Sequence, residues 1–503
     1  MENTPALPSG YAGMRVLVMG LGLHGGGLES VRYLARHGAE LTVTDLRDER
    51  VLAPSLEQLE ALIGEAPPIR YVLGRHDIED FKRADMVIKN PGVRPDSPLL
   101  KAARRIETDI SLFLACAPSR LIAVTGSKGK SSTASAIHWV LQKARNQGLL
   151  PGRAYLGGNI TVSPLSFLDA LTAEDDVVLE LSSWQLGDLK GRLKRSDTGH
   201  TEALLKPRVA VFTAIMADHL DYYGSMDAYI ADKRILYQGQ DAQDLTIAGD
   251  DDWGQSFLRE SRGRSLVYAE RPLPADVAGG WLDGPGGPGL ARVPHHFPEP
   301  LVGVPLGEPV ELVPPGVLVP GAHQKKNLLA AALSLLDLGL SPDCIRGSMG
   351  AFPGIEHRLE FFHEAAGIRF YNDTSATIPE AAAAALTAFD APVVLVTGGT
   401  DKNLDFTPLV RGAARAKARI LLAGTGSERL KLLLDEAGLS YQGPFDRLDR
   451  AIRASLEAAA AGDVVVLSPG CASFGMFVNE FDRGRQWKEG VCTMFSGSSV
   501  HPG

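Results

Sequence analysis

The chain has 503 residues, too many for one hydrophobic core, so its length predicts about two to four domains. Hydrophobic residues make up 45% of the chain and charged residues 22%, the balance of a globular protein rather than a disordered one. The net charge of -9 disfavours general binding to the phosphate backbone of DNA or RNA, so no nucleic-acid partner is expected.

Short apolar runs alternate with Ala- and Leu-rich helical patterns along the chain. Unbroken runs rich in β-branched residues suit strands that are buried on both faces, and helices between such strands imply parallel sheets. The pattern therefore predicts an α/β protein. The predicted strands are 16–19, 41–44, 86–88, 121–124, 177–180, 209–212, 393–396, 420–422 and 464–467.

The spacing of these strands predicts three sheets and three domains. We expect an N-terminal Rossmann-like sheet in residues 1–111, a central, mostly parallel sheet in 112–353, and a C-terminal Rossmann-like sheet in 354–503. The Pro- and Gly-rich stretch from about 271 to 320 is predicted to be β-rich or irregular. Open parallel sheets bind ligands at the carboxyl ends of their strands, so the loops after these strands are the candidate sites.

A glycine turn, Gly20-x-Gly22-x-x-Gly25, follows the first predicted strand, and Asp45 ends the second one. This spacing is typical of dinucleotide binding, because such a turn lets the backbone approach a pyrophosphate. A UDP group, which is also a pyrophosphate on a ribose, suits the turn as well as NAD does. A third interpretation is tight packing of helix on strand without any ligand.

A second glycine loop follows the strand 121–124 and precedes a helical pattern over 132–143. Its backbone N–H groups would converge on phosphate oxygens at a helix N-terminus, Lys130 would reach the terminal phosphates, and Ser131 would supply a hydroxyl to Mg²⁺. The first glycine of the usual P-loop is replaced by Val124, so this is a shortened variant. The loop predicts a central domain of the P-loop ATPase type, with ATP bound by Gly126, Ser127, Lys128, Gly129, Lys130, Ser131 and Ser132.

Two further strand ends in this domain carry candidate metal ligands. Glu180 closes the strand 177–180, where a carboxylate beside an ATP loop is well placed to bind Mg²⁺. The alternative is a structural carboxylate that caps the next helix. Asp218-His219 follows the strand 209–212; a lone histidine is more often simply hydrogen bonded, but its place at a third strand end suits a metal role.

The four cysteines are far apart and form no C-x-x-C pair, which argues against a disulfide framework and a thiolate zinc site. The beginning of the chain lacks a basic segment followed by an apolar one, and no stretch approaches the roughly 18 apolar residues of a membrane span. We therefore expect a cytoplasmic protein without a membrane partner, and we expect a monomer.

Taken together, these motifs resemble those of the Mur ligases, which are ATP-dependent amino-acid ligases of peptidoglycan precursor synthesis. Nearly the whole chain takes part in the resemblance. Within the family, the set is most similar to the ligases that add D-glutamate to UDP-N-acetylmuramoyl-L-alanine, since the Asp-Asn-Pro-Arg run of the diamino-acid ligases is absent. The matching segments are 125–132, 157–160, 180–183, 218–219, 321–327, 356–358, 372–377, 398–402 and 468–473.

The resemblance implies that ATP converts a carboxylate to an acyl phosphate, which the incoming amine then attacks. Because the phosphoryl group and the attacking carboxylate are both anionic, their repulsion must be offset by positive charge. Lys130 and a Mg²⁺ ion held by Ser131 and Glu180 would supply this charge. A second Mg²⁺ would lie near His219, together with a carbamylated lysine at Lys233. The nucleotide would also contact Asn159, Asn327, Arg358 and Asp373.

Lys233 carries two different expectations. On its sequence context alone it is an ordinary helical lysine with a solvated charge. A carbamate, in contrast, forms on a neutral amine and needs a site that lowers the lysine pKa by desolvation or nearby cations.

The remaining residues implied by the resemblance bind the two substrates. Cationic and hydroxyl groups suit a dicarboxylate, and Thr377, Lys402 and Ser473 would hold glutamate. The UDP-sugar would bind at Leu23, His24, Asp45, Arg47 and Asn90. The chain departs from the family pattern at His24, Leu46, Gln324, Ser375, Ile378 and Gly475.

Three other functions remain open. A ligase that adds glutamate to folate shares the ATP domain but does not need an N-terminal pyrophosphate-binding sheet. An NAD-dependent oxidoreductase is supported by the first glycine turn alone. A P-loop switch or scaffold that binds ATP without catalysing a reaction would not need the carboxylate-binding residues Thr377, Lys402 and Ser473. For the ligase, we expect the site to be assembled by domain closure, which excludes water from the acyl phosphate.

Overall fold

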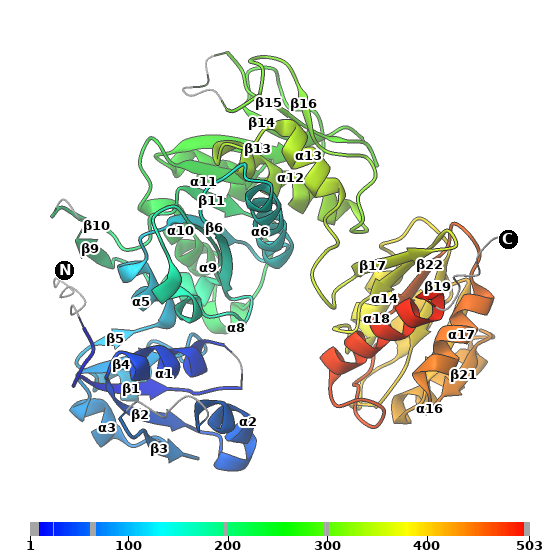
Figure 1. Cartoon of the computed structure of the whole chain (residues 1–503), viewed down its shortest axis with the longest axis horizontal. Coiled ribbons are helices and arrows are strands. Elements are labelled where there is room, and N and C mark those ends of the chain that lie inside the picture. Colours follow the sequence, from blue (N-terminus) through cyan, green and yellow to red (C-terminus); the bar gives the residue numbers. More distant parts are fainter. Residues whose placement is uncertain are drawn as a thin grey trace. The chain divides into compact units, whose positions relative to one another are not determined.

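The computed structural model describes residues 10–23, 25–60, 67–195, 199–284, 286–295, 297 and 301–496. His24, one of the predicted UDP-sugar contacts, lies outside these residues. The chain divides into two compact units (Figure 1). Unit 1 comprises Met1–Gly284, Pro288–Leu312 and Asn327–Ser348, and unit 2 comprises Pro285–Gly287, Val313–Lys326 and Met349–Gly503.

The first sheet of unit 1 is parallel and has the strand order β3-β2-β1-β4-β5. Val16 and Val18 of β1 face one apolar core, whereas Leu17 and Met19 face the other, so the sheet is buried on both sides. Its strands are β1 (Arg15–Met19), β2 (Glu40–Asp45), β3 (Arg70–Leu73), β4 (Met86–Lys89) and β5 (Ile106–Glu107). Its helices are α1 (Gly26–Arg36), α2 (Glu49–Glu60), α3 (Ile78–Arg83), α4 (Pro98–Lys101) and α5 (Asp109–Cys116).

The second sheet of unit 1 has the order β16-β15-β14-β13-β12-β11-β6-β8-β7. It is parallel from β7 to β14, and β15 pairs antiparallel with β14. Its strands are β6 (Arg120–Thr125), β7 (Ala154–Gly158), β8 (Asp176–Glu180), β11 (Val209–Phe212), β12 (Leu245–Gly249), β13 (Arg264–Ala269), β14 (Gly279–Leu282), β15 (Gly289–Arg292) and β16 (Val310–Val313). A separate hairpin is formed by β9 (Leu193–Arg195) and β10 (Thr201–Ala203).

Helices follow most strands of this second sheet, as parallel connections require. The α-helices are α6 (Lys130–Asn146), α7 (Ser183–Gly187), α8 (Leu220–Tyr223), α9 (Met226–Lys233), α10 (Ile235–Gln238), α11 (Asp252–Glu260), α12 (Ala322–Asp337) and α13 (Pro342–Gly350). Two 3₁₀ turns, η1 (Pro164–Ser166) and η2 (Leu168–Ala170), precede β8.

Buried polar contacts join the two sheets of unit 1. Lys89, at the end of β4, forms an ion pair of 2.8 Å with Asp188 after α7, and their side chains are 3% and 8% exposed. Ser163 donates a hydrogen bond of 2.9 Å to Asp109, the first residue of α5. The loop after β4 is therefore held in a defined position against the segment after β8.

Unit 2 contains a sheet of order β17-β18-β22-β19-β20-β21, parallel except for β17. Its central strands β19 and β22 are fully buried, and apolar cores lie on both faces of the sheet. The strands are β17 (Glu360–Ala365), β18 (Ile368–Asn372), β19 (Val393–Thr397), β20 (Ala418–Leu422), β21 (Gln442–Phe445) and β22 (Val464–Leu467). The helices are α14 (Pro379–Leu386), α15 (Thr407–Ala413), α16 (Thr425–Glu436), α17 (Leu448–Ala458) and α18 (Glu480–Ser496).

The predicted α/β fold with three parallel-rich sheets is confirmed, and each of the nine predicted strands is present. Strands also occur in the Pro- and Gly-rich stretch, as β14, β15 and β16. Of the helices in the described part of the chain, none is both long and apolar enough to cross a bilayer. The residue boundaries of the three domains stay a prediction.

Candidate active site

The loop between β6 and α6 depends on glycine at two positions. Gly126 has φ 148° and Gly129 has φ 92°, backbone conformations that side chains disfavour. A Cβ at Gly126 would overlap the hydroxyl of Thr213, and one at Gly129 would lie 2.9 Å from Asn327 Cγ. Asn327 therefore packs directly against the loop, although the two segments lie far apart in the sequence.

Ser127 ties this loop to the segment that follows β11. Its hydroxyl donates to the carbonyl of Met216 at 2.8 Å, accepts the N–H of the same residue at 2.9 Å, and lies 2.9 Å from the hydroxyl of Tyr229. The loop and the approach to His219 are thus fixed to each other. Sequence reasoning missed Tyr229, because its partner lies 102 positions away.

Lys130 begins α6 and lies across the glycine loop. Its ammonium donates to the carbonyls of Gly126 and Ser127 at 3.1 and 3.2 Å. Lys128 is exposed, Ser131 is half-buried and Ser132 is buried. The loop thus presents a lysine ammonium beside backbone N–H groups at a helix N-terminus, an arrangement that favours anions.

Lys233 is 1% exposed, so its interpretation as a solvated helical lysine is wrong. Its ammonium donates to the carbonyl of Gly126 at 2.9 Å and lies 3.4 Å from the hydroxyl of Thr125. Burial, together with the nearby Lys130 cation, lowers the pKa of Lys233 to about 7. This amine therefore loses its proton much more readily near neutral pH than an ordinary lysine does.

Glu180 ends β8 and is 1% exposed. Its Oε1 accepts a hydrogen bond of 2.8 Å from Asn159 Nδ2. Its Oε2 is buried and has no hydrogen-bond partner among the described residues. A buried carboxylate oxygen without a partner is costly, so this atom fits a role as a cation ligand.

His219 lies in the loop after β11 with φ 52° and a side chain that is 44% exposed. Its ring packs 4.8 Å from that of Trp184, and Trp184 packs 5.4 Å from Tyr222. Arg94, from the loop after β4, lies over the Tyr222 ring at 4.9 Å. The imidazole is therefore oriented by a stack that extends to the first sheet.

The UDP-sugar residues predicted in the first sheet lie at its carboxyl edge. The Asp45 carboxylate accepts the N–H of Gly22 at 3.1 Å and that of Arg47 at 2.9 Å, which fixes the glycine turn. Asn90 follows the neighbouring strand β4 and accepts the N–H of Gly92 at 3.1 Å. The side chains of Leu23 and Arg47 are exposed at this edge.

In unit 2, Asp373 follows β18 and is 5% exposed. Its carboxylate accepts from Ser468 Oγ at 2.6 Å and from the N–H of Leu359 at 3.1 Å. Burial raises the pKa of Asp373 to about 6, against the opposing effect of these hydrogen bonds. Arg358, the other residue assigned to the nucleotide here, is exposed in the turn before β17.

Three loops that carry the predicted glutamate residues are hydrogen bonded to one another. Gly470 N–H donates to Ala376 O at 2.8 Å, and Thr400 and Ala472 exchange two backbone hydrogen bonds of 3.0 Å. Thr377, Lys402 and Ser473 lie in these loops; Lys402 is exposed, Thr377 half-buried and Ser473 buried. The strand ends of β18, β19 and β22 thus form one rim.

Three of the departures from the family pattern, at Ser375, Ile378 and Gly475, lie in loops of unit 2. Ser375 donates its N–H to His357 O at 3.1 Å, and Ile378 is 45% exposed before α14. Gly475 has φ 99°, and a Cβ there would meet Thr400 Oγ1 at 3.8 Å. Gln324 is half-buried at the start of α12.

Three family models match the chain. They describe a Mur ligase MurD-like N-terminal domain over residues 14–111, a Mur ligase middle domain over 124–271, and a Mur ligase glutamate ligase domain over 357–471. The NAD-dependent oxidoreductase alternative, which depended on one glycine turn, receives no support from these matches.

Solved structures show the same fold at low sequence identity. The UDP-N-acetylmuramate-alanine ligase of Thermotoga maritima is 16% identical with a TM-score of 0.51, over 96% of this chain and 100% of that one. MurF of Acinetobacter baumannii is 17% identical with a TM-score of 0.52, over 91% and 92%.

Curated relatives are similar along almost their full length. A UDP-N-acetylmuramoylalanine–D-glutamate ligase of Treponema pallidum is 39% identical over 98% of this chain and 100% of the relative. A ligase of the same name from Roseiflexus is 40% identical over 95% and 98%. Because identity of this degree extends through all three matched regions, the chain belongs to the Mur ligase family of ATP-dependent ligases.

Proposed function

We propose that this chain joins D-glutamate to UDP-N-acetylmuramoyl-L-alanine at the expense of ATP, a step in peptidoglycan precursor synthesis. The observation that carries the proposal is the convergence of three neighbouring parallel strands. β11, β6 and β8 lie side by side and end at the His219 loop, the glycine loop and Glu180. The names of the relatives from Treponema pallidum and Roseiflexus support the choice of substrates.

The chain's own residues supply what acyl-phosphate formation needs. Backbone N–H groups of 126–129 and the ammonium of Lys130 bind the phosphates and offset their charge, so that the substrate carboxylate can approach. Ser131, Glu180 and His219 would hold Mg²⁺, with two ions as in the family pattern. Bound there, Mg²⁺ would neutralise negative charge that develops on the transferred phosphoryl group. Asn159 orients the Glu180 carboxylate through its hydrogen bond.

The proposal includes a carbamate on Lys233. The amine is buried, its pKa is lowered to about 7, and it lies beside the glycine loop, so CO₂ would meet a neutral amine far more often than at an ordinary lysine. The carbamate would add a negative charge next to the Lys130 cation. This group would complete the second metal site together with His219.

The first sheet would bind the UDP-sugar and unit 2 the amino acid. The Asp45-stabilised glycine turn, Leu23, Arg47 and Asn90 would contact the uracil nucleotide, as would His24. In unit 2, Thr377, Lys402 and Ser473 would bind the two glutamate carboxylates. Asn327, Arg358 and Asp373 would also contact the nucleotide.

Phosphate release tests the function directly. The purified chain is incubated with ATP, Mg²⁺, UDP-N-acetylmuramoyl-L-alanine and either glutamate enantiomer, and a folate acceptor replaces the UDP-sugar in a parallel reaction. In the complete mixture with the UDP-sugar, we expect phosphate and a new UDP-linked product with D-glutamate but not with L-glutamate. Phosphate release with folate instead of the UDP-sugar would favour the folate-ligase alternative, and no ADP in any mixture would refute the ligase. Light scattering tests the expected monomer.

A further inference from the structure

The turn that carries Arg358 has an unusual backbone. His357 and Leu359, on either side of it, adopt φ values of 68° and 42°, the left-handed region that residues other than glycine disfavour. Such a conformation is energetically unfavourable and persists where surrounding contacts impose it. The conformation of Arg358 therefore depends on the groups that hold this turn.

Glu360 is the centre of those contacts. Its Oε2 accepts the N–H of His357 at 2.9 Å and the side-chain amide of Asn372 at 3.0 Å. The same amide nitrogen lies 2.9 Å from His357 Nδ1. On the other side of Arg358, Asp373 accepts the N–H of Leu359. Both left-handed residues are thus hydrogen bonded to side chains of β17 or the end of β18.

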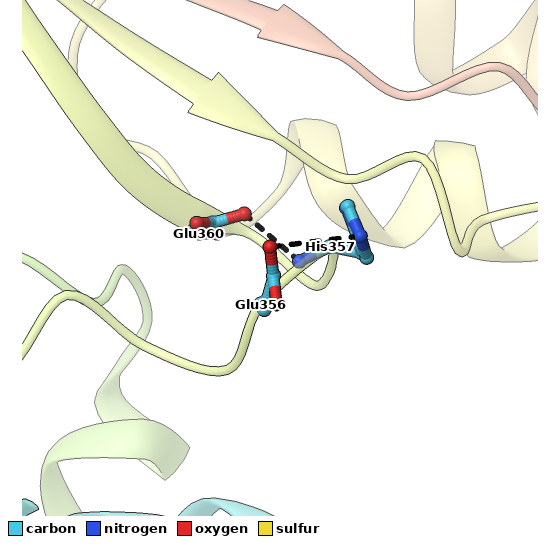
Figure 2. Close-up of side chains that lie close together, drawn as sticks. All are labelled: Glu356, His357 and Glu360. Carbon is cyan, nitrogen blue, oxygen red and sulfur yellow. Dashed lines mark hydrogen bonds and ion pairs between the residues drawn. The ribbon is translucent and has the colours of Figure 1, made fainter. Parts of the chain in front are cut away.

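Lys488 on α18 completes the arrangement. Its ammonium donates to Glu360 Oε1 at 2.8 Å and to Glu356 Oε1 at 2.9 Å. Figure 2 shows the side chains of Glu356, His357 and Glu360 gathered at the turn. One possible ligand atom from each of them lies within 4.8 Å of the other two. Such a group resembles a metal site, but the ammonium already binds both carboxylates, and Lys488 holds the pKa of Glu356 below its ordinary value.

The helix that bears Lys488, α18, is itself hydrogen bonded to the end of β18 and the residues that follow it. Arg483 donates to Thr374 Oγ1 at 2.9 Å and to its carbonyl at 3.0 Å, and Trp487 donates to Tyr371 O at 3.1 Å. Gly484 permits this approach, since a Cβ there would lie 2.6 Å from Thr374 Cγ2 and overlap the His357 ring. These contacts fix α18 against the end of β18 and thereby hold the Lys488 side chain in place beside Glu360.

We propose that Lys488 is a positioning residue for nucleotide binding: through Glu360 it fixes the turn 355–359 and thereby presents the Arg358 guanidinium to ATP. Lys488 contacts no reactant itself. The inference rests on the proposed function, because Arg358 is assigned to the nucleotide there.

The test compares three variants with the unchanged chain. Lys488→Met removes the cation, Lys488→Arg keeps it, and Lys431→Met removes a lysine that pairs with Glu428 at 3.1 Å on α16 of the same unit. ADP affinity is measured by calorimetry without turnover. The KM of ATP, of the UDP-sugar and of glutamate is measured by phosphate release, and folding by thermal melting.

We expect Lys488→Met to raise the Kd of ADP and the KM of ATP about tenfold, with the other two KM values within twofold. Lys488→Arg should recover most of the affinity, and Lys431→Met should behave as the unchanged chain. Unchanged ADP affinity in Lys488→Met would overturn the inference and leave the proposed function intact. So would an equal rise in all three KM values with a lower melting temperature, the mark of a merely structural role. Failure of the unchanged chain to bind ADP would overturn both.

Discussion

Replacement of Gly129 by alanine tests the geometry of the phosphate loop. Two costs follow from the structure. The φ of 92° places an alanine in the left-handed region, at about 1 kcal/mol. The new Cβ would lie 2.9 Å from Asn327 Cγ and closer still to Asn327 Oδ1, whereas ordinary contact begins at 3.4 Å, so Asn327 and the loop must move apart. Overpacking of this kind adds about 1–2 kcal/mol.

Gly148, just beyond the other end of α6, provides the matched control. Its φ is 72° and a Cβ there meets nothing within 4 Å, so Gly148→Ala carries the backbone cost without the collision. Urea unfolding should show a loss of about 1 kcal/mol for Gly148→Ala and about 2–3 kcal/mol for Gly129→Ala.

The kinetic difference between the two variants should be larger than the difference in stability. A displacement of the loop misplaces the phosphates, and we expect the kcat/KM of ATP in phosphate release to fall about 100-fold for Gly129→Ala. Gly148→Ala should leave it unchanged. If both variants turned over ATP equally well, the argument that this glycine shapes the phosphate site would be refuted.

Three further predictions concern single side chains. Lys130→Ala should abolish phosphate release while circular dichroism shows an intact fold; retained turnover would contradict its placement on the phosphates. Glu180→Gln keeps an acceptor for Asn159 but loses the charge, so the Mg²⁺ concentration for half-maximal phosphate release should rise at least about tenfold. Asp373 has a folded pKa of about 6 against an ordinary 3.8, so the folded state binds this proton more tightly. Its contribution to stability is present below pH 4 and is lost as the pH rises to about 6, by at most about 1.4 kcal/mol per pH unit. Urea unfolding of Asp373→Asn between pH 4 and 7 should lack this component, and a pH dependence equal to that of the unchanged chain would contradict it.

The strands that could be predicted from the sequence share one physical property. They lie inside parallel sheets, buried on both faces, so selection for burial leaves an unbroken apolar run such as that of β22. The sequence does not reveal β7, because it ends in two glycines, or β17, because it is an antiparallel edge strand with half-buried His363 and exposed Glu364. Both strands pair with a neighbour, β7 with β8 and β17 with β18, and sequence composition alone does not reveal such pairing.

The candidate site divides in a similar way. The glycine loop and Glu180 could be proposed from the sequence because their chemistry is contained in a few consecutive residues. The burial of Lys233 could not, since it arises from contact with Gly126, 107 positions away. The support that Ser468 gives to Asp373 spans 95 positions and was missed for the same reason. Local sequence records which groups are present, and the fold decides which of them share an environment.

The buried pair of Lys89 and Asp188 bears on how modular this chain is. Removal of one partner of a buried ion pair leaves an unsolvated charge, at a cost of about 3–5 kcal/mol. A chimera that takes its first sheet from a relative will therefore fold well when the donor supplies a cation at the position of Lys89 or when the recipient gives up Asp188 in the same exchange. The contact between the two sheets includes this buried ion pair, so recombination between them must exchange Lys89 and Asp188 together.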